Sequence, residues 1–123
     1  EQDWSTAAHF LQIFTALLLD RKLPFDVDLL KIDVPENALP STPWRTTRLA
    51  RSPYYFKELS GPGPTSTFGE GTTVIKTGIE ALDPETDIYA VAVDKVISVT
   101  PISLDLTSRV NLLDLQAYIK PQG

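Results

Sequence analysis

SVTPISLDLT, residues 98–107, is the stretch from which the fold of this chain is best worked out. Its first residues continue a β-branched segment, Val96 to Thr100, which predicts a strand. Pro101 interrupts this pattern, because proline has no amide hydrogen to donate to a sheet. We therefore expect the strand to give way there to an extended passage that runs to about Leu106.

A terminal helix is predicted after this passage. Thr107 or Ser108 offers a side-chain oxygen that can cap its first turn. Four residues at helical spacing share one face of the helix: Leu112, Leu115, Gln116 and Ile119. We interpret residues 101–123 as an extended hinge and a terminal helix. Hinge or interface contacts are expected from Ser98, Thr100, Pro101, Asp105 and Thr107.

A turn and a short apolar segment come before the strand. Asp83, Pro84 and Glu85 have the composition of a turn. Residues Ile88 to Val93 follow, and they are too few for periodicity to separate a helix from a strand. Both assignments stay open for this segment.

The middle of the chain is rich in proline. Six of the ten prolines lie between Pro35 and Pro64, so regular structure is expected there only in short pieces. Three segments have strand-like composition: Trp44 to Ala50, Tyr54 to Leu59 and Thr72 to Thr77. Gly, Pro, Ser and Thr dominate residues 60–71, which predicts a flexible loop. We interpret residues 35–80 as a long β-hairpin arm with this loop at its tip.

The first third of the chain predicts a helix and a strand. Ser5 is a good N-cap, and apolar residues then recur as one helical stripe: Phe10, Ile13, Phe14, Leu17 and Leu18. The helix is expected from about Thr6 to about Lys22, before Pro24. Apolar and polar residues alternate from Leu29 to Val34, as in a strand. The order helix, strand, β-arm, strand, helix predicts a single α/β unit over residues 1–123.

Composition narrows the range of functions. The net charge of -5 argues against nucleic-acid binding, since phosphate neutralisation needs an excess of Lys and Arg. The absence of cysteine excludes disulfides, thiolate catalysis and Cys-based zinc sites, and it suits the cytoplasm. No apolar run approaches the roughly 20 residues of a membrane span. Because the chain has no Met and begins at Glu1, we interpret it as a fragment or a processed product.

Catalytic constellations are scarce in the sequence. His9 is the only histidine and lies inside the predicted helix, so we expect it to be structural. The glycines between residues 61 and 71 stand among prolines with no helix after them, which argues against a phosphate loop. The carboxylates of Asp26 and Asp28, and those of the 83–87 turn, are interpreted as solvated turn residues. No catalytic or metal-binding residue is therefore predicted.

One stretch is basic within this acidic chain. A run of 13 residues without any acid contains Arg45, Arg48, Arg51 and Lys57, with Tyr54 and Tyr55 among them. Guanidinium groups bind phosphate and aromatic rings stack on bases, which suits an anion- or nucleotide-facing surface. Arg and Tyr are also typical of subunit interfaces. Both interpretations stay open, and we favour the interface.

Four segments, taken in order, resemble the SurE family. LKIDVP at residues 30–35 resembles the strand that the family writes as L-N-I-N-V-P. The pattern T-R-x-x-R-x-x-Y-Y is matched by Thr47, Arg48, Arg51, Tyr54 and Tyr55. TDIYAV at residues 86–91 resembles T-D-x-x-A-V, and residues 98–107 resemble S-V-T-P-L-x-L-D-L-T. The ordered set spans most of the chain.

The resemblance implies that this chain is the C-terminal portion of a Rossmann-type α/β hydrolase. It implies a phosphatase acting on nucleoside 5′- or 3′-monophosphates with a divalent metal, Mg²⁺ or Mn²⁺. The family's metal-binding motifs belong to its N-terminal half and are not found in this sequence. In the family an extended hairpin and a terminal helix serve dimer or tetramer assembly. Self-association through the β-arm and the last helix is therefore implied here too.

Three functional hypotheses follow. The first is the oligomerisation-bearing half of the nucleotidase, inactive in isolation because the metal-binding half is absent. The second is a non-catalytic module that binds an anion or a nucleotide through the Arg45 to Lys57 surface. The third is a purely structural protein.

Overall fold

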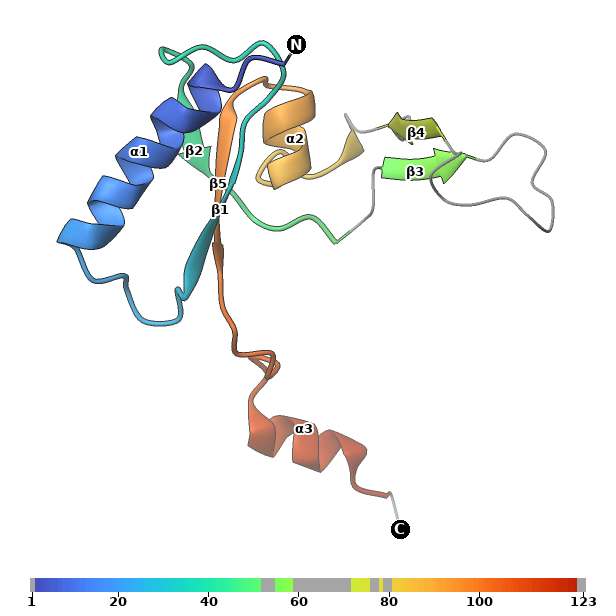
Figure 1. Ribbon diagram of the computed structural model, residues 1–123. Helices are drawn as coiled ribbons and strands as arrows, with labels where there is room; N and C mark the ends of the chain where they lie inside the picture. The colour runs from blue at the N-terminus through green and yellow to red at the C-terminus, as the bar shows by residue number, and fades with distance from the viewer. Residues whose placement is uncertain (1, 52–54, 59–71, 76–77, 79–80, 122–123) are drawn as a thin grey trace, which may run out of the picture.

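A small sheet between two helices forms the body of the molecule (Figure 1). The computed structural model describes residues 2–51, 55–58, 72–75, 78 and 81–121. Along the chain its elements are α1 (Ser5–Asp20), β1 (Leu29–Asp33), β2 (Trp44–Thr46), β3 (Tyr55–Glu58), β4 (Thr72–Ile75), α2 (Asp87–Ala92), β5 (Ile97–Ile102) and α3 (Leu112–Ile119). The predicted α/β class is confirmed.

The central strand of the sheet is β5, and the strand order is β1-β5-β2. β1 runs antiparallel to β5, with Ile32 opposite Val99. β2 runs parallel to β5, with Thr46 opposite Val99. A parallel pair requires a long crossover connection, and here that connection contains β3, β4 and α2.

The helix α1 covers one face of this sheet. Phe10 and Phe14 lie about one turn apart on the helix and pack against Ile97 and Val99 of β5, and all four side chains are buried. Residues of β1 and the position after it complete the cluster: Leu30, Ile32 and Val34. Burying a side chain of this size contributes about 1.5–3 kcal/mol. The alternating residues of the first strand therefore pack against the core, as predicted. Of the predicted helical stripe only Phe10 and Phe14 are buried, whereas the other three residues are exposed: Ile13, Leu17 and Leu18.

The start of α1 differs from the prediction. Trp4, and not Ser5, occupies the N-cap position, and no side chain caps the helix from there. Instead the carboxylate of Asp3 accepts the Ser5 N–H at 2.9 Å. An acid before the first turn provides the acceptor that was expected from the serine, and its charge also suits the positive end of the helix. The helix ends at Asp20, two residues earlier than expected.

The undecided segment before β5 is a helix. α2 is capped by Thr86, whose side chain accepts an N–H of the first turn at 3.4 Å. Ile88 and Ala90 are buried. Figure 1 shows α2 on the side of the sheet opposite α1. The sheet is therefore covered on both faces, by a long helix on one and a short helix on the other.

The β-arm is shorter than the predicted range of residues 35–80. β2 lies inside that range but belongs to the sheet, where it pairs with β5. β3 and β4 form the antiparallel pair of the arm, with Tyr55 opposite Ile75 and Glu58 opposite Thr72. This pair extends away from the sheet (Figure 1). The predicted tip, residues 60–71, lies outside the described residues.

The last helix also extends away from the body (Figure 1). None of the residues of α3 is buried. Its N-cap is Asn111, whose side-chain oxygen accepts two N–H groups of the first turn at 2.9 and 3.2 Å. The predicted cap at Thr107 or Ser108 is wrong, because a capping oxygen must stand directly before the first helical residue. Within the described ranges, no helix combines the length and the apolar content that crossing a membrane requires.

Candidate functional site

The face of β5 that points away from α1 is polar. Ser98 and Thr100 alternate along the strand with Ile97 and Val99, and their exposed fractions are 0% and 1%. The hydroxyl of Thr47 lies 2.7 Å from the Ser98 hydroxyl and 2.8 Å from that of Thr100. Ser98 and Thr100 were expected at a hinge or an interface, but the structure places them inside the sheet. Their hydroxyls are satisfied there by a side chain of the neighbouring strand segment, as burial requires.

A buried carboxylate binds a residue on the same face of the sheet, because its partner Lys31 stands opposite Thr100. Asp87, the first residue of α2, is only 5% exposed. Its Oδ1 accepts the N–H of Ala50 and the N–H of Ile88, both at 2.9 Å. Its Oδ2 accepts a hydrogen bond from the ammonium of Lys31 at 3.0 Å, and this ammonium also forms an ion pair with Asp33. One carboxylate therefore joins β1, the segment after β2 and the start of α2.

These contacts fix the charges of the pair. Burial acts to raise the pKa of Asp87, but the Ala50 N–H and the Lys31 ammonium outweigh it and hold this pKa below 3.8. Burial acts to lower the pKa of Lys31, but its hydrogen bonds to Asp33 and Asp87 raise this pKa above 10.5. Both groups are therefore charged at neutral pH, and they form an ion pair rather than a proton-transfer pair.

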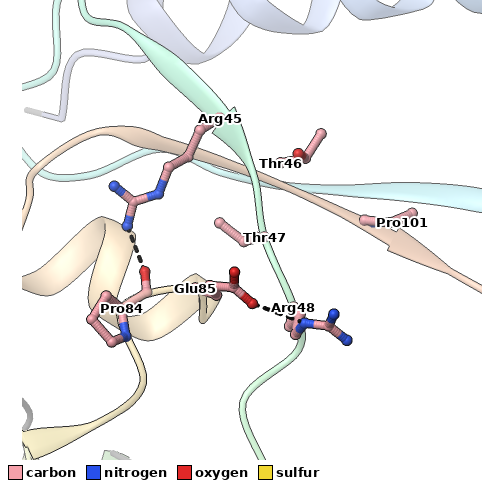
Figure 2. A pocket seen from close by; sticks show the side chains of 7 residues that line it. All are labelled: Arg45, Thr46, Thr47, Arg48, Pro84, Glu85 and Pro101. Atoms are coloured by element: carbon pink, nitrogen blue, oxygen red, sulfur yellow. Dashed lines mark hydrogen bonds and ion pairs between the residues drawn. The ribbon is translucent and has the colours of Figure 1, made fainter.

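A cleft of about 630 Å³ opens beside this polar region (Figure 2). Its walls come from β2 and the residues after it, from the turn before α2 and from β5: Arg45, Thr46, Thr47, Arg48, Pro84, Glu85 and Pro101. Two of the arginines from the predicted basic stretch are thus brought to one cleft. Main-chain pairing explains why, because Arg48 donates its N–H to the carbonyl of Glu85 at 2.8 Å.

Both arginines of the cleft are already paired. Arg45 contacts Asp94 at 2.6 Å and donates to the carbonyl of Pro84 at 2.8 Å. Arg48 contacts Glu85 at 3.1 Å. Figure 2 shows Arg45 directed at Pro84 and Glu85 directed at Arg48. Acids of the same surface therefore balance the two guanidinium charges, and an anionic ligand would have to compete with them.

Of the remaining residues of the basic stretch, only Arg51 has a described side chain. Arg51 is exposed after β2 and does not line the cavity. Tyr54 and the side chain of Tyr55 lie outside the described part of the chain. Among the described side chains of the basic stretch, Arg45 and Arg48 therefore line the cleft and Arg51 does not.

The passage from β5 to α3 is held by hydrogen bonds. Pro101 lies within β5, so the strand continues through it to Ile102. Asp105 accepts the N–H of Thr107 at 2.9 Å, and this contact holds the pKa of Asp105 below its usual value. Arg109 reaches back to Asp26, in the segment between α1 and β1, at 2.9 Å. The predicted hinge residues Asp105 and Thr107 therefore belong to a bonded turn rather than to an open linker.

The described residues do not form a metal site on their own. Across residues 2–51, 55–58, 72–75, 78 and 81–121, no three side chains of His, Asp or Glu come together. Asp26 and Asp28 instead accept hydrogen bonds from residues 103 and 104, each at 2.7 Å. His9 lies edge-on to the ring of Phe10. Asp87 was interpreted as a solvated turn residue, and its burial shows that this was wrong. The divalent ion that the resemblance implies does not fit these residues alone.

Two residues that organise the site carry no functional signal by themselves. In the sequence Lys31 has the pattern of a solvent-facing residue in an alternating strand. Thr47 is a β-branched residue within a segment of strand-like composition. The usable signal is the pair Thr86 and Asp87, because a capping residue followed by an acid before an apolar run is typical of a helix start. That pattern predicts the helix, but it does not predict that the acid is buried.

Curated relatives of this chain are SurE proteins. The chain is 36% identical over 122 residues to the 5'-nucleotidase SurE of Thermococcus kodakarensis, covering 98% of this chain and 46% of that protein. It is 35% identical over 116 residues to the protein of the same name from Thermococcus gammatolerans, covering 93% of this chain and 42% of the relative. It is 30% identical over 123 residues to the 5'-nucleotidase SurE of Methanocella arvoryzae, covering 97% of this chain and 44% of that protein.

No protein-family model matches the chain. The similarity to the curated relatives nevertheless runs along almost all of it, and the segments that carry the resemblance lie within the matched length. The chain spans less than half the length of these relatives. The resemblance found in the sequence is therefore confirmed: the chain belongs to the SurE family and corresponds to less than half of a SurE protein.

Proposed function

We propose that this chain is the part of a cytoplasmic SurE-type nucleotidase that carries assembly, and that the chemistry requires the rest of the protein. The complete protein would hydrolyse nucleoside 5′- or 3′-monophosphates with Mg²⁺ or Mn²⁺ held by residues outside this chain. Support comes from the name that the relatives share, 5'-nucleotidase, and from their length, more than twice that of this chain.

The observation that carries the assembly role is the exposure of α3. The predicted face of this helix includes Leu112 and Ile119, which are 68% and 65% exposed. An isolated helix of eight residues is marginal in water, and most helical stability in proteins comes from packing an apolar face. The apolar side chains of α3 gain that packing when a second copy of the chain covers them, which is the partner we propose.

The arm supports the same role from another direction. β3 and β4 form a two-stranded pair that extends away from the sheet (Figure 1). A two-stranded hairpin is marginally stable alone in water and gains stability from packing against another element. The arm and α3 leave the body at different places, so each would provide its own contact with a neighbouring copy.

A matched pair of lysine substitutions tests the assembly role. Ile119→Lys places a charge on the apolar face of α3, whereas Ala117→Lys places the same charge on its other side. We expect wild-type protein and Ala117→Lys to self-associate equally in sedimentation velocity, and Ile119→Lys to self-associate more weakly while α1 and the sheet stay folded by circular dichroism. A wild-type chain that stays monomeric at all accessible concentrations would overturn the proposal.

The activity of the isolated chain is tested separately. We expect no release of phosphate from AMP or from 3′-AMP, with Mg²⁺, with Mn²⁺ or with neither. The control is a mixture containing a complete SurE protein under the same conditions, which should release phosphate. Metal-dependent turnover by the pure chain would show that the chemistry does not need the rest of the protein.

The cleft supports a second candidate, a module that binds a small anion. Arg45 and Arg48 both line it, and the pair formed by Arg48 and Glu85 is exposed enough to exchange partners. Titration of the chain with AMP would then shift the amide resonances of residues 45–48. Arg48→Ala should abolish this shift, while Arg21→Ala, which removes a similarly exposed arginine directly after α1, should not. No shift in the wild type would exclude this candidate.

A further inference from the structure

Two segments connect the arm to the body: one follows β2 and the other precedes α2. They form the base of the arm, where a short parallel pairing joins them. Arg48 pairs with Thr86 as an isolated bridge, outside the named strands. The N–H of Arg48 donates to the carbonyl of Glu85 at 2.8 Å, and the N–H of Asp87 donates to the carbonyl of Arg48 at 2.9 Å. In a regular parallel ladder the next bond would run from the N–H of Ala50 to the carbonyl of Asp87.

That bond is not made by the main chain. Asp87 is the first residue of α2, so its carbonyl points along the helix axis. The side chain takes its place, because Oδ1 of Asp87 accepts the N–H of Ala50 at 2.9 Å. The carboxylate thus adds one bond to the ladder at Ala50, in the segment that follows β2.

The carboxylate itself is held in a fixed orientation. The ammonium of Lys31 in β1 donates to Oδ2 at 3.0 Å. The N–H of Ile88 donates to Oδ1, the oxygen that also accepts the N–H of Ala50. With an exposed fraction of 5% for Asp87, these bonds are largely removed from competing water. One side chain, that of Asp87, therefore connects the segment after β2 to Lys31 of the central sheet.

We propose that Asp87 is the positioning residue of the β-arm: with Lys31 it fixes the direction in which β3 and β4 leave the body, and so presents the arm to a second copy of the chain. The partner in this statement rests on the proposed function, whereas the positioning does not. Fixing the direction in advance removes part of the ordering cost of assembly.

Spin labels measure the positioning directly. Because the chain contains no cysteine, labels on Gln12→Cys in α1 and Lys57→Cys in β3 report one distance within the molecule. The labelled chain is diluted with excess unlabelled protein, so that distances between copies do not contribute. We expect a narrow distance distribution in the parent protein and a broad one in Asp87→Ala.

Two matched variants separate positioning from general destabilisation. Asp33→Ala removes the other carboxylate on Lys31 but touches no residue of the arm base, and it should leave the distribution narrow. Asp87→Asn keeps an oxygen acceptor for Ala50 and should restore most of the narrow distribution. A narrow distribution in Asp87→Ala, or equal broadening in Asp33→Ala, would overturn the proposal.

Self-association of the same variants tests the partner. The dissociation constant of the assembly should rise about tenfold or more in Asp87→Ala and stay unchanged in Asp33→Ala, because an arm without a fixed direction must be ordered on binding. If the wild-type chain does not assemble, the proposed function fails, while the label distances still decide the positioning.

A measurement on the wild type covers the case in which Asp87→Ala does not fold. On acidification, the amide proton of Ala50 should shift with the same midpoint as the side-chain carboxyl carbon of Asp87, since the two groups share a hydrogen bond. The amide of Ile88 should shift with them. An Ala50 amide that stays constant while Asp87 titrates would show that the bond is not formed in solution.

Discussion

The two faces of β5 are built from different chemistry. One face presents Ile97 and Val99 to the aromatic rings of α1, and the other presents Ser98 and Thr100 to the hydroxyl of Thr47. Both faces are buried to the same degree. Apolar contacts are non-directional and depend on the area removed from water, whereas hydroxyl contacts require particular distances and angles. The first face therefore supplies most of the stability, and the second fixes the position of what is joined to it.

The magnitudes agree with this division. Each fully buried aliphatic or aromatic side chain contributes about 1.5–3 kcal/mol, while one hydrogen bond between neutral groups contributes about 0.5–1.5 kcal/mol net. The hydroxyl face nevertheless cannot be left incomplete, since a buried polar group without a partner costs about 1–3 kcal/mol. The polar face excludes wrong arrangements of β2 against β5 more than it favours folding as such.

The largest effect is expected on the apolar face. Phe14→Ala removes a buried ring that packs in the core and meets Trp44 edge-on at 5.3 Å. We expect a loss of about 3–5 kcal/mol in the free energy of unfolding, measured by urea denaturation. Thr15→Ala, at the next and exposed position of α1, should change it little. A small loss for Phe14→Ala would mean that α1 is not held to the sheet by this cluster.

A smaller effect is expected on the hydroxyl face. Thr47→Val keeps the shape of the side chain but removes the oxygen that Ser98 and Thr100 both use. These two hydroxyls are 3.5 Å apart and only weakly bonded to each other, so we expect a loss of about 1–3 kcal/mol in the free energy of unfolding. Thr46→Val, at the exposed neighbouring position of β2, is the control. A neutral Thr47→Val would show that the hydroxyl cluster does not constrain the sheet.

The apolar face could be predicted from the sequence, and the polar face could not. Helical spacing in α1 and alternation in β1 both follow from burial of one side of an element, so local periodicity reveals them. For β5 the β-branched residues predict the strand, but they say nothing about which strands it joins. The parallel pairing of β2 with β5 depends on contacts far apart in the sequence, and for this reason the arm was predicted to begin too early.

Burial of polar residues is hidden for the same reason. A serine or threonine beside a proline suggests a hinge, and only the position of Thr47 in space shows that Ser98 and Thr100 are interior. In the same way, an acid in a turn suggests solvent, and only contacts across the fold, with the Lys31 ammonium and the Ala50 N–H, make the burial of Asp87 acceptable. The cleft between β2 and the start of α2 also arises from pairing that no local pattern predicts.

The ion pair of the polar face should make stability depend on pH. The pKa of Asp87 lies below 3.8 in the folded chain, so its contribution is present above that pH and is lost as the pH falls through the folded value. The pKa of Lys31 lies above 10.5, so its contribution is present below that pH and is lost on going higher. Urea midpoints of wild type and Asp87→Asn should therefore converge in acid.

This expectation is specific to the buried carboxylate. Other acids of the chain, such as Asp26 and Asp105, also have lowered pKa values, so the wild type keeps some acid dependence in any variant. The informative quantity is the difference between wild type and Asp87→Asn at each pH from 2 to 7. A difference that is the same at pH 2 and at pH 7 would mean that the charge of Asp87 does not stabilise the fold.

The smallest effect is expected at Glu85, two residues before Asp87. Its pair with Arg48 has a comparable distance, 3.1 Å, but both side chains are largely exposed, at 71% and 77%. Water and salt screen such a pair, so Glu85→Gln should change the free energy of unfolding by less than about 1 kcal/mol. The change should vanish in 1 M NaCl, whereas that of Asp87→Asn should largely persist, because salt screens buried pairs much less. Equal effects for the two variants would show that burial does not separate the two carboxylates, and that the polar face gains nothing from its exclusion of water.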